Sequence, residues 1–188
     1  LLARYQIVPH TGRMQFQESA AWIPSLGIRY SLGIDGISLF LVLLTTAITP
    51  IVIVSARVRK SVAGYLALLL ALETGMLGAF LALDIVLFYV FWEAMLVPMY
   101  FLIGVWGGER RIYAAIKFFL YTAAGSLLML IALLYVFMAY KAQSGHYSGA
   151  LFDLWTVTLA PTQQLWLFAA FALAFAIKVP IFPLHTWL

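Results

Sequence analysis

Long apolar runs constrain this chain more than any other feature of its sequence. A helix needs roughly 20 residues to cross a hydrocarbon core of about 30 Å, and five runs reach that length. They cover residues 34–56, 62–83, 85–105, 113–140 and 163–188. Each run is continuously apolar, whereas a membrane barrel strand alternates apolar and polar residues. The sequence therefore predicts an all-α integral membrane protein with about five transmembrane helices.

Composition supports this class and excludes several others. Hydrophobic residues make up 65% of the chain and charged residues only 10%, against about a quarter charged in soluble proteins. The net charge of +4 comes from basic residues spread among short loops, which does not favour nucleic-acid binding. Cysteine is absent, so this chain supplies no disulfide and no thiolate ligand for a metal or an iron–sulfur cluster. We predict no cofactor site and no metal site in this chain.

The two ends of the sequence indicate a piece of a longer protein. The chain starts at Leu1 without a methionine and stops at Leu188 inside an apolar pattern. We expect residues 1–32 to form an extramembrane loop segment with short structured pieces, on the non-cytoplasmic side. Residues 33–188 are expected to form the transmembrane bundle.

Basic residues in the loops predict the orientation. Five of them follow the first and third spans: Arg57, Arg59, Lys60, Arg110 and Arg111. Because helices alternate in direction, both loops lie on one side, and the positive-inside rule assigns that side to the cytoplasm or the mitochondrial matrix. The opposite loops carry only Lys141, although Arg4, Arg13 and Arg29 in the N-terminal segment reduce the asymmetry. Residues 149–161 there predict either a short amphipathic helix or an aromatic-rich loop.

Four charged residues lie inside the predicted spans, away from the first two residues of each: Glu73, Glu93, Lys117 and Lys178. A charge at the centre of a membrane helix costs roughly 2.5–3.5 kcal/mol on insertion scales, so each is a functional candidate. Structural interpretations remain open for all of them. Glu93 and Lys178 could form a static ion pair, Lys117 could extend to the headgroups, and Glu73 could face either a close helix contact or a polar cavity.

The last span carries two helix breakers. Pro180 and Pro183 follow Lys178 closely, so the helix is expected to break just after the lysine. A broken helix beside a buried lysine is typical of ion sites in transporters. His185 lies two helical turns beyond Lys178 and either extends a proton path or only makes structural hydrogen bonds.

A glutamate–lysine couple in a half-hydrated membrane core can move protons when water access alternates between the two sides. Each proton needs about 2.3 kcal/mol of work against 100 mV. The chain has no phosphate-binding glycine loop and no dinucleotide fingerprint, so the energy must come from a partner or an ion gradient.

Several separate motifs carry a family resemblance. The stretches "LDIVLFYVFWEAMLVPMYFLIGVWGG", "RRIYAAIKFFLYTAAGSLLML" and "AFAIKVPIFPLHTWL", with the lead-in "WIPSLGIRYSLGIDGISL", resemble the antiporter-like membrane subunits of respiratory complex I. Among these, the M chains of bacterial NADH-quinone oxidoreductase and the mitochondrial subunit 4 look most similar. The resemblance implies an inverted-repeat bundle, of which this fragment lacks two N-terminal helices and everything after the first broken helix.

The resemblance also implies roles for particular residues. Glu93 and Lys178 are expected to be the couple essential for proton pumping. Lys117 and His185 look like members of the polar axis of the membrane arm, and Glu73 matches an acidic position of the family. NADH, FMN, iron–sulfur clusters and quinone are expected in partner subunits, in a bacterial or mitochondrial inner membrane. The expected partners are other membrane-arm subunits, including neighbouring antiporter-like chains.

Two alternatives accompany this prediction. Subunits of multi-subunit cation/proton antiporters and of membrane-bound hydrogenases share the glutamate, the lysine and the broken helix. A purely structural membrane subunit would instead use its buried charges to hold its neighbours in register. That alternative predicts that neutralising Glu93 harms assembly rather than transport.

Overall fold

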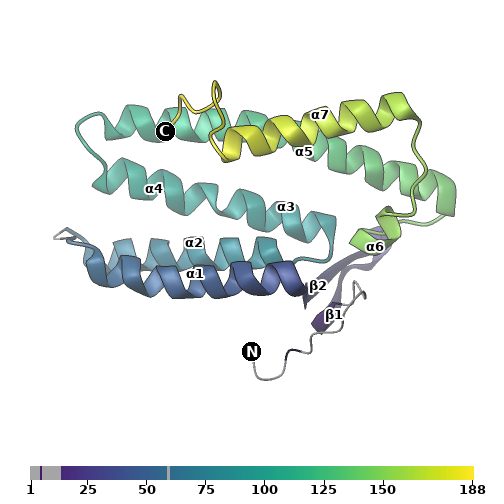
Figure 1. The fold of residues 1–188 in the computed structure, drawn as a ribbon, viewed down its shortest axis with the longest axis horizontal. Helices are drawn as coiled ribbons and strands as arrows, with labels where there is room; N and C mark the ends of the chain where they lie inside the picture. Colours follow the sequence, from purple (N-terminus) through teal and green to yellow (C-terminus); the bar gives the residue numbers. More distant parts are fainter. Residues whose placement is uncertain (1–4, 6–13, 59) are drawn as a thin grey trace.

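The structure, a computed structural model, describes residue 5, residues 14–58 and residues 60–188. A β-hairpin precedes a bundle of long helices that run side by side (Figure 1). The elements are β1 (Gln15–Ile23), η2 (Pro24–Leu26), β2 (Ile28–Ile34), α1 (Gly36–Ser55), α2 (Val62–Leu81), α3 (Ile85–Ala94), α4 (Leu96–Trp106), α5 (Arg111–Ser144), α6 (Leu151–Leu154) and α7 (Pro161–Lys178). The α3–α4 pair lies between the α1–α2 pair and the α5–α7 pair. The predicted helical membrane class is confirmed.

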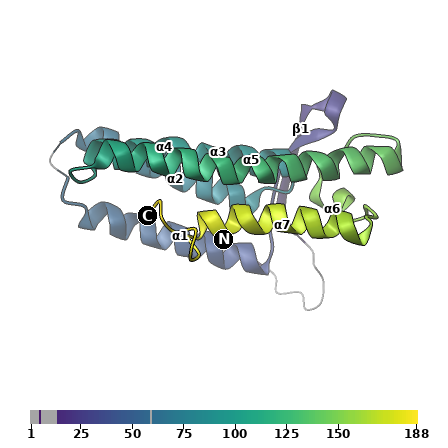
Figure 2. The same cartoon turned by 90° about the horizontal axis from the view of Figure 1, so that it is seen from above.

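The predicted transmembrane spans correspond closely to these helices. Within the described residues, four spans are long and apolar enough to cross a membrane: Gly36–Ser55, Val62–Leu81, Ile85–Trp106 and Arg111–Ser144. The fifth predicted span corresponds to α7, which is not among these four. Its 18 residues begin with a polar turn and end at Lys178. Figures 1 and 2 both place α7 alongside α5, against which it packs.

The predicted break after Lys178 is present. Helix α7 ends at Lys178, and the N–H of Val179 bonds to the carbonyl of Phe175 at 2.8 Å. Because Pro180 has no N–H, it cannot continue the helical ladder. Residues 179–188 fold instead as a series of turns.

The third predicted span is interrupted, contrary to the continuous run in the sequence. Helix α3 ends at Ala94 and α4 begins at Leu96, with Met95 between them. Pro98 explains the interruption, because it cannot donate to the carbonyl of Ala94 and its ring crowds that carbonyl. Glu93 therefore lies in the last turn of α3.

The predicted N-terminal loop contains a β-hairpin. Strands β1 and β2 pair antiparallel, with Ala20 opposite Tyr30. Gly27 joins them with a φ of 61°, and a Cβ there would lie 2.1 Å from the carbonyl oxygen of Tyr147. Both the turn and the contact therefore require glycine. Residues 1–4 and 6–13 of the predicted loop, with Arg4 and Arg13, lie outside the described residues.

Each end of the bundle is tied together by contacts between loops. At one end, the indole of Trp106 donates to the carbonyl of Lys60 at 2.7 Å, which joins the two basic loops. At the other end, the carboxylate of Asp84 is 1% exposed and accepts the backbone N–H of Arg29 at 3.0 Å. The N–H of Ile85 also bonds to the carbonyl of Gly149 at 2.9 Å. The hairpin, the turn before α3 and the loop after α5 therefore form one layer.

The segment predicted as either an amphipathic helix or a loop contains one helical turn, α6. Leu154 is buried there, whereas Phe152 and Trp155 are exposed. Leu154 joins the main core, in which residues of α5 such as Met129 and Phe137 pack against α3, α7 and β2. The structure therefore combines features of both alternatives.

Candidate functional site

Glu93 is the acidic group of the site. It lies in the last turn of α3, and its Oε1 atom is buried without a hydrogen-bond partner among the described residues. The hydroxyl of Tyr89, one turn earlier on the same face, is within reach of the Glu93 carboxylate and of the Ser126 hydroxyl on α5. A buried carboxylate oxygen without a hydrogen-bond partner lowers the stability of the fold, so its presence here requires an explanation.

Helix α5 places two buried hydroxyl groups, those of Ser126 and Thr122, on the side of the site opposite α3. Ser126 is 3% exposed and donates to the carbonyl of Ala123 at 3.0 Å. Thr122, one turn earlier, is 4% exposed and donates to the carbonyl of Phe118 at 2.6 Å. Because they are four residues apart, both lie on one face of α5. Each hydroxyl oxygen can also accept a hydrogen bond from another group.

Lys178 is the basic group of the site and the last residue of α7. Its Nζ atom lies 5.0 Å from the centre of the Trp92 ring, in a cation–π contact. Trp92 also packs edge-on against Phe175, one turn before Lys178, with ring centres 5.5 Å apart. The helix C-terminus further favours a positive charge at this position. These contacts bring α7 to the end of α3.

The structure brings Glu93 and Lys178 close enough for electrostatic interaction. Although both residues are described, they form no direct ion pair, and the Trp92 ring contacts the lysine ammonium instead. The arrangement is therefore a separated couple. Trp92 directly precedes Glu93 but carries no charge, so the sequence alone does not mark it as part of the site.

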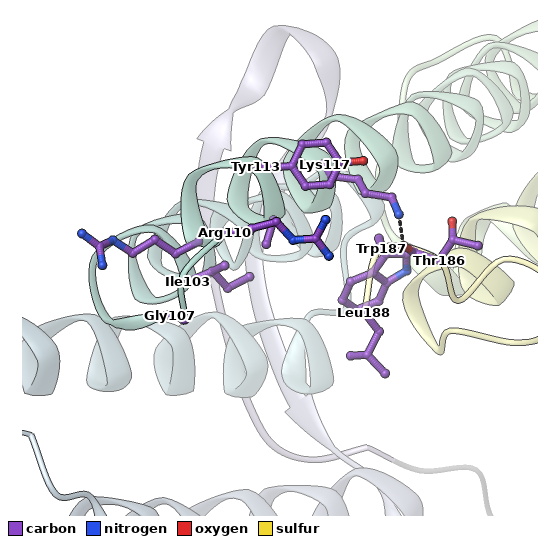
Figure 3. Close-up of a pocket in the computed structure, with 11 residues that line it drawn as sticks. Ile103, Gly107, Arg110, Tyr113, Lys117, Thr186, Trp187 and Leu188 are labelled. Carbon is purple, nitrogen blue, oxygen red and sulfur yellow. Dashed lines mark hydrogen bonds between the residues drawn. The ribbon is translucent and has the colours of Figure 1, made fainter.

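Lys117 is directed toward the segment that follows the broken helix. Its ammonium donates to the backbone carbonyl of Thr186 (Figure 3). The indole of the next residue, Trp187, donates to the carbonyl of Ile177 at 2.8 Å, and its ring contacts that of Phe118. Lys117 therefore joins α5 to residues 179–188.

The other two predicted residues lie apart from this group. Glu73 makes no hydrogen bond or ion pair with any residue that the structure describes, and the close contact of α2 with α3 is made by its neighbours Gly75 and Gly78. His185 is exposed, and its ring stacks on that of Phe182. Neither residue joins the Glu93 cluster in this structure.

Comparison with known proteins identifies the family. Residues 82–188 match the family described as NADH:quinone oxidoreductase/Mrp antiporter, transmembrane. The chain belongs to this family. The matched residues include Glu93, Lys117 and Lys178, whereas Glu73 precedes them. The resemblance predicted from the sequence motifs is confirmed.

Individual relatives extend the similarity over nearly the whole chain. Subunit M of NADH-quinone oxidoreductase from Rhodobacter capsulatus is 46% identical over 190 residues, which cover 96% of this chain and 36% of that subunit. The chain thus spans little more than a third of that curated relative's length. A chain of respiratory complex I from Thermus thermophilus superimposes with a TM-score of 0.79 at 38% identity, over 96% of this chain and 37% of its own length. A chain of the Mrp complex from Dietzia gives 0.77 at 26% identity, over 92% and 19%.

Proposed function

We propose that this chain belongs to a proton-translocating membrane subunit of an NADH:quinone oxidoreductase, and that Glu93 and Lys178 carry the proton transfer. The observation that carries the proposal is the buried Oε1 of Glu93, which has no partner among the described residues. A purely structural carboxylate would be expected to satisfy its oxygens, because an unpaired buried acceptor costs about 1–3 kcal/mol. A group that binds and releases protons needs an oxygen free to accept one.

The separation of the couple supports two charge states. When Glu93 is ionised, its charge attracts the Lys178 ammonium across a gap bordered by Trp92. A proton arriving at Glu93 neutralises the carboxylate and removes that attraction, so Lys178 can then release its own proton. When the proton leaves Glu93, the attraction returns and Lys178 is protonated again. Each cycle moves one proton through each group without a change in covalent structure.

Tyr89 and Ser126 provide a polar connection from Glu93 toward α5. Both are hydroxyls, which donate and accept hydrogen bonds at once and can therefore relay a proton. We assign Lys117 a position on the same polar axis because it lies on α5 and contacts the segment after Lys178. Glu73 and His185 remain candidate members of the axis.

The energy for translocation is assigned to other subunits. Redox chemistry with NADH, FMN, iron–sulfur clusters and quinone would take place there, since this chain has no cysteine to hold a cluster. Its partners would be membrane-arm subunits, including other antiporter-like chains, in a bacterial or mitochondrial inner membrane. The basic loops at residues 57–60 and 110–111 would face the cytoplasm or the matrix.

The deciding experiment replaces Glu93 by glutamine in the full-length subunit of the intact complex. We expect NADH-driven proton pumping and the coupled quinone reduction to fall about tenfold or more, while the complex assembles normally on a native gel. Glu109→Gln is the matched control, because Glu109 is an exposed acid in the loop between α4 and α5. Normal rates in Glu93→Gln would reject the proposed mechanism. A loss of assembly alone would instead support the structural alternative.

A cation/proton antiporter is the second candidate, favoured by the similarity to the Mrp complex chain. It predicts cation-driven proton exchange in vesicles that lack NADH and quinone. Exchange that depends on Glu93 but not on quinone reduction would select this function. The same vesicles, supplied with quinone and energised by NADH, test the first proposal.

A further inference from the structure

A basic pocket lies at the end of the bundle where α4 ends and α5 begins. Its volume is about 330 Å³. Residues of α4, α5, the loop between them and the C-terminal segment surround it (Figure 3). Its polar lining includes Arg110, Arg111, Tyr113, Lys117, Thr186 and Trp187. None of these residues belongs to the Glu93 cluster.

The positive charges of the pocket are largely unneutralised. Arg110 and Arg111 form no ion pair with any described acid, including the adjacent Glu109. Lys117 donates one hydrogen bond to the carbonyl of Thr186, which leaves two of its three N–H groups available. The guanidinium groups match phosphate oxygens in geometry, and the lysine adds a compact charge. The pocket therefore has the charge complement of a phosphate group.

An apolar groove adjoins this pocket on the outer face of α5. It has a volume of about 400 Å³ and shares Tyr113 and Lys117 with the pocket. Its other lining residues are Ile116, Leu120, Tyr121 and Ala124. Spacings of three and four residues place these side chains on one helix face. From Tyr113 to Ala124 the groove follows α5 for about 16 Å, at 1.5 Å per residue.

We propose that the pocket and the groove together bind one anionic phospholipid. Its phosphate would contact Arg110, Arg111 and Lys117, and one acyl chain would lie along the groove. A cationic pocket at the end of a membrane helix favours an anionic headgroup, and the adjoining groove matches an acyl chain, which free phosphate lacks. Tyr113 and Trp187, with polar atoms on apolar rings, are typical of this interfacial level.

Such a lipid would also stabilise the segment after the broken helix. Two residues of the pocket, Lys117 and Trp187, make the hydrogen bonds that hold residues 179–188 against α5 and α7. A phosphate beside Lys117 restrains the lysine in this position, and the acyl chain covers exposed apolar side chains such as Leu120. The site lies apart from Glu93 but shares Lys117 with the proposed polar axis, so the variants that test it leave Lys117 unchanged.

The test uses the intact complex with the full-length subunit, stripped of lipid and returned to phosphatidylcholine nanodiscs with or without phosphatidylglycerol. Native mass spectrometry counts retained phosphatidylglycerol, and thermal unfolding of the subunit reports stabilisation. We expect the double variant Arg110→Gln/Arg111→Gln to weaken phosphatidylglycerol binding about tenfold or more. Arg110→Lys/Arg111→Lys keeps the charge and should retain most of the binding. Arg57→Gln/Lys60→Gln, which removes two charges from the other basic loop, should leave this lipid bound.

A groove variant separates a lipid from a free anion. Leu120 is 62% exposed, so Leu120→Ser is expected to fold. This variant should weaken binding of long-chain phosphatidylglycerol. Binding of a short-chain phosphatidylglycerol, whose acyl chains are too short to fill the groove, should be unchanged. If the double glutamine variant fails to assemble, Leu120→Ser carries the test alone. The proposal would be overturned if the wild type, the double glutamine variant and Leu120→Ser retained equal amounts of phosphatidylglycerol. It would also be overturned if inorganic phosphate competed for the site as strongly as phosphatidylglycerol does. Coverage of the pocket by another subunit, or by another part of the full-length subunit, would give the first of these results.

Discussion

The indole N–H of Trp187 donates to the backbone carbonyl of Ile177 at 2.8 Å. Because α7 stops at Lys178, its last carbonyls lack the partners that a continuing helix would supply. Val179 satisfies the carbonyl of Phe175 through its backbone N–H, but Ile177 is satisfied by a side chain from ten residues further along the chain. A helix interrupted within a membrane protein requires such internal partners.

Trp187→Phe should therefore loosen the segment after the break. Phenylalanine keeps a ring to pack against Phe118 but cannot donate to Ile177, which leaves a carbonyl unpaired at a cost of about 1–3 kcal/mol. The measurement is the labelling rate of a cysteine introduced as Val179→Cys, followed by mass spectrometry of the peptide that contains residue 179. Labelling should be faster when Trp187→Phe is added. Trp166→Phe is the control, since Trp166 lies on α7 and is 76% exposed; equal acceleration by both variants would contradict the prediction.

Asp84 is predicted to be the residue at the hairpin end of the bundle whose loss is most damaging. Its carboxylate accepts the N–H groups of Val86 at 2.9 Å, Leu87 at 3.3 Å and Arg29 at 3.0 Å. Asp84→Ala removes a helix cap and a bond to the hairpin together, so we expect a loss of about 2–4 kcal/mol in stability. Thermal unfolding of the purified subunit measures this loss.

Two further variants refine the Asp84 prediction. Asp84→Asn keeps one acceptor oxygen, and its cost should be smaller than that of alanine. Asp35→Ala removes a cap from α1 whose bonds reach only the neighbouring Ile37 and Ser38, so about 1 kcal/mol is expected. A cost for Asp84→Ala no larger than that for Asp35→Ala would refute the role of Asp84 in joining the hairpin to α3.

Tyr89→Phe should slow proton pumping without preventing assembly. The substitution removes the hydroxyl beside Glu93 and Ser126 and keeps the ring. Loss of one hydrogen bond worth about 1 kcal/mol corresponds to roughly a fivefold reduction in rate. The initial rate of NADH-driven proton pumping per assembled complex is the measurement. Tyr135→Phe, which removes a hydroxyl bonded to Gln163 at the exposed face, should pump normally, and an equal effect of both variants would count against a Tyr89 relay.

Gly78→Ala should separate α2 from α3. A Cβ at Gly78 would lie 2.3 Å from the ring of Phe91, so the two helices must shift. Overpacking of this kind costs about 1–3 kcal/mol, which exceeds the gain of up to about 1 kcal/mol from helix propensity. We expect a lower thermal unfolding midpoint than for Gly108→Ala, where the added Cβ meets no atom within 4 Å. A midpoint equal to that of Gly108→Ala would exclude a tight contact.

Some structural features were recoverable from the sequence and others were not. Pro180 correctly predicted the end of α7 because a missing N–H acts locally. Pro98 carries the same signal for the break between α3 and α4, yet the continuous apolar run around it predicts one helix. Strand β1 lacks clear alternation, because its residues are mostly exposed on both faces, and the hairpin was predicted only as a loop with structured pieces. Ser126 gave no signal, since a serine in an apolar helix is ordinary in sequence.

The sequence by itself determined the membrane class, the helical spans and the charged residues within them. These properties follow from hydropathy and backbone chemistry along a single segment. Only the tertiary structure decided which groups lie together: Lys178 with the Trp92 ring, Lys117 with Thr186, and the Ser126 hydroxyl near that of Tyr89. Such contacts depend on the rotation and separation of packed helices, which are set by close approaches such as that of Gly125 to Ile177. No single segment contains that information, because each contact joins residues from two of them.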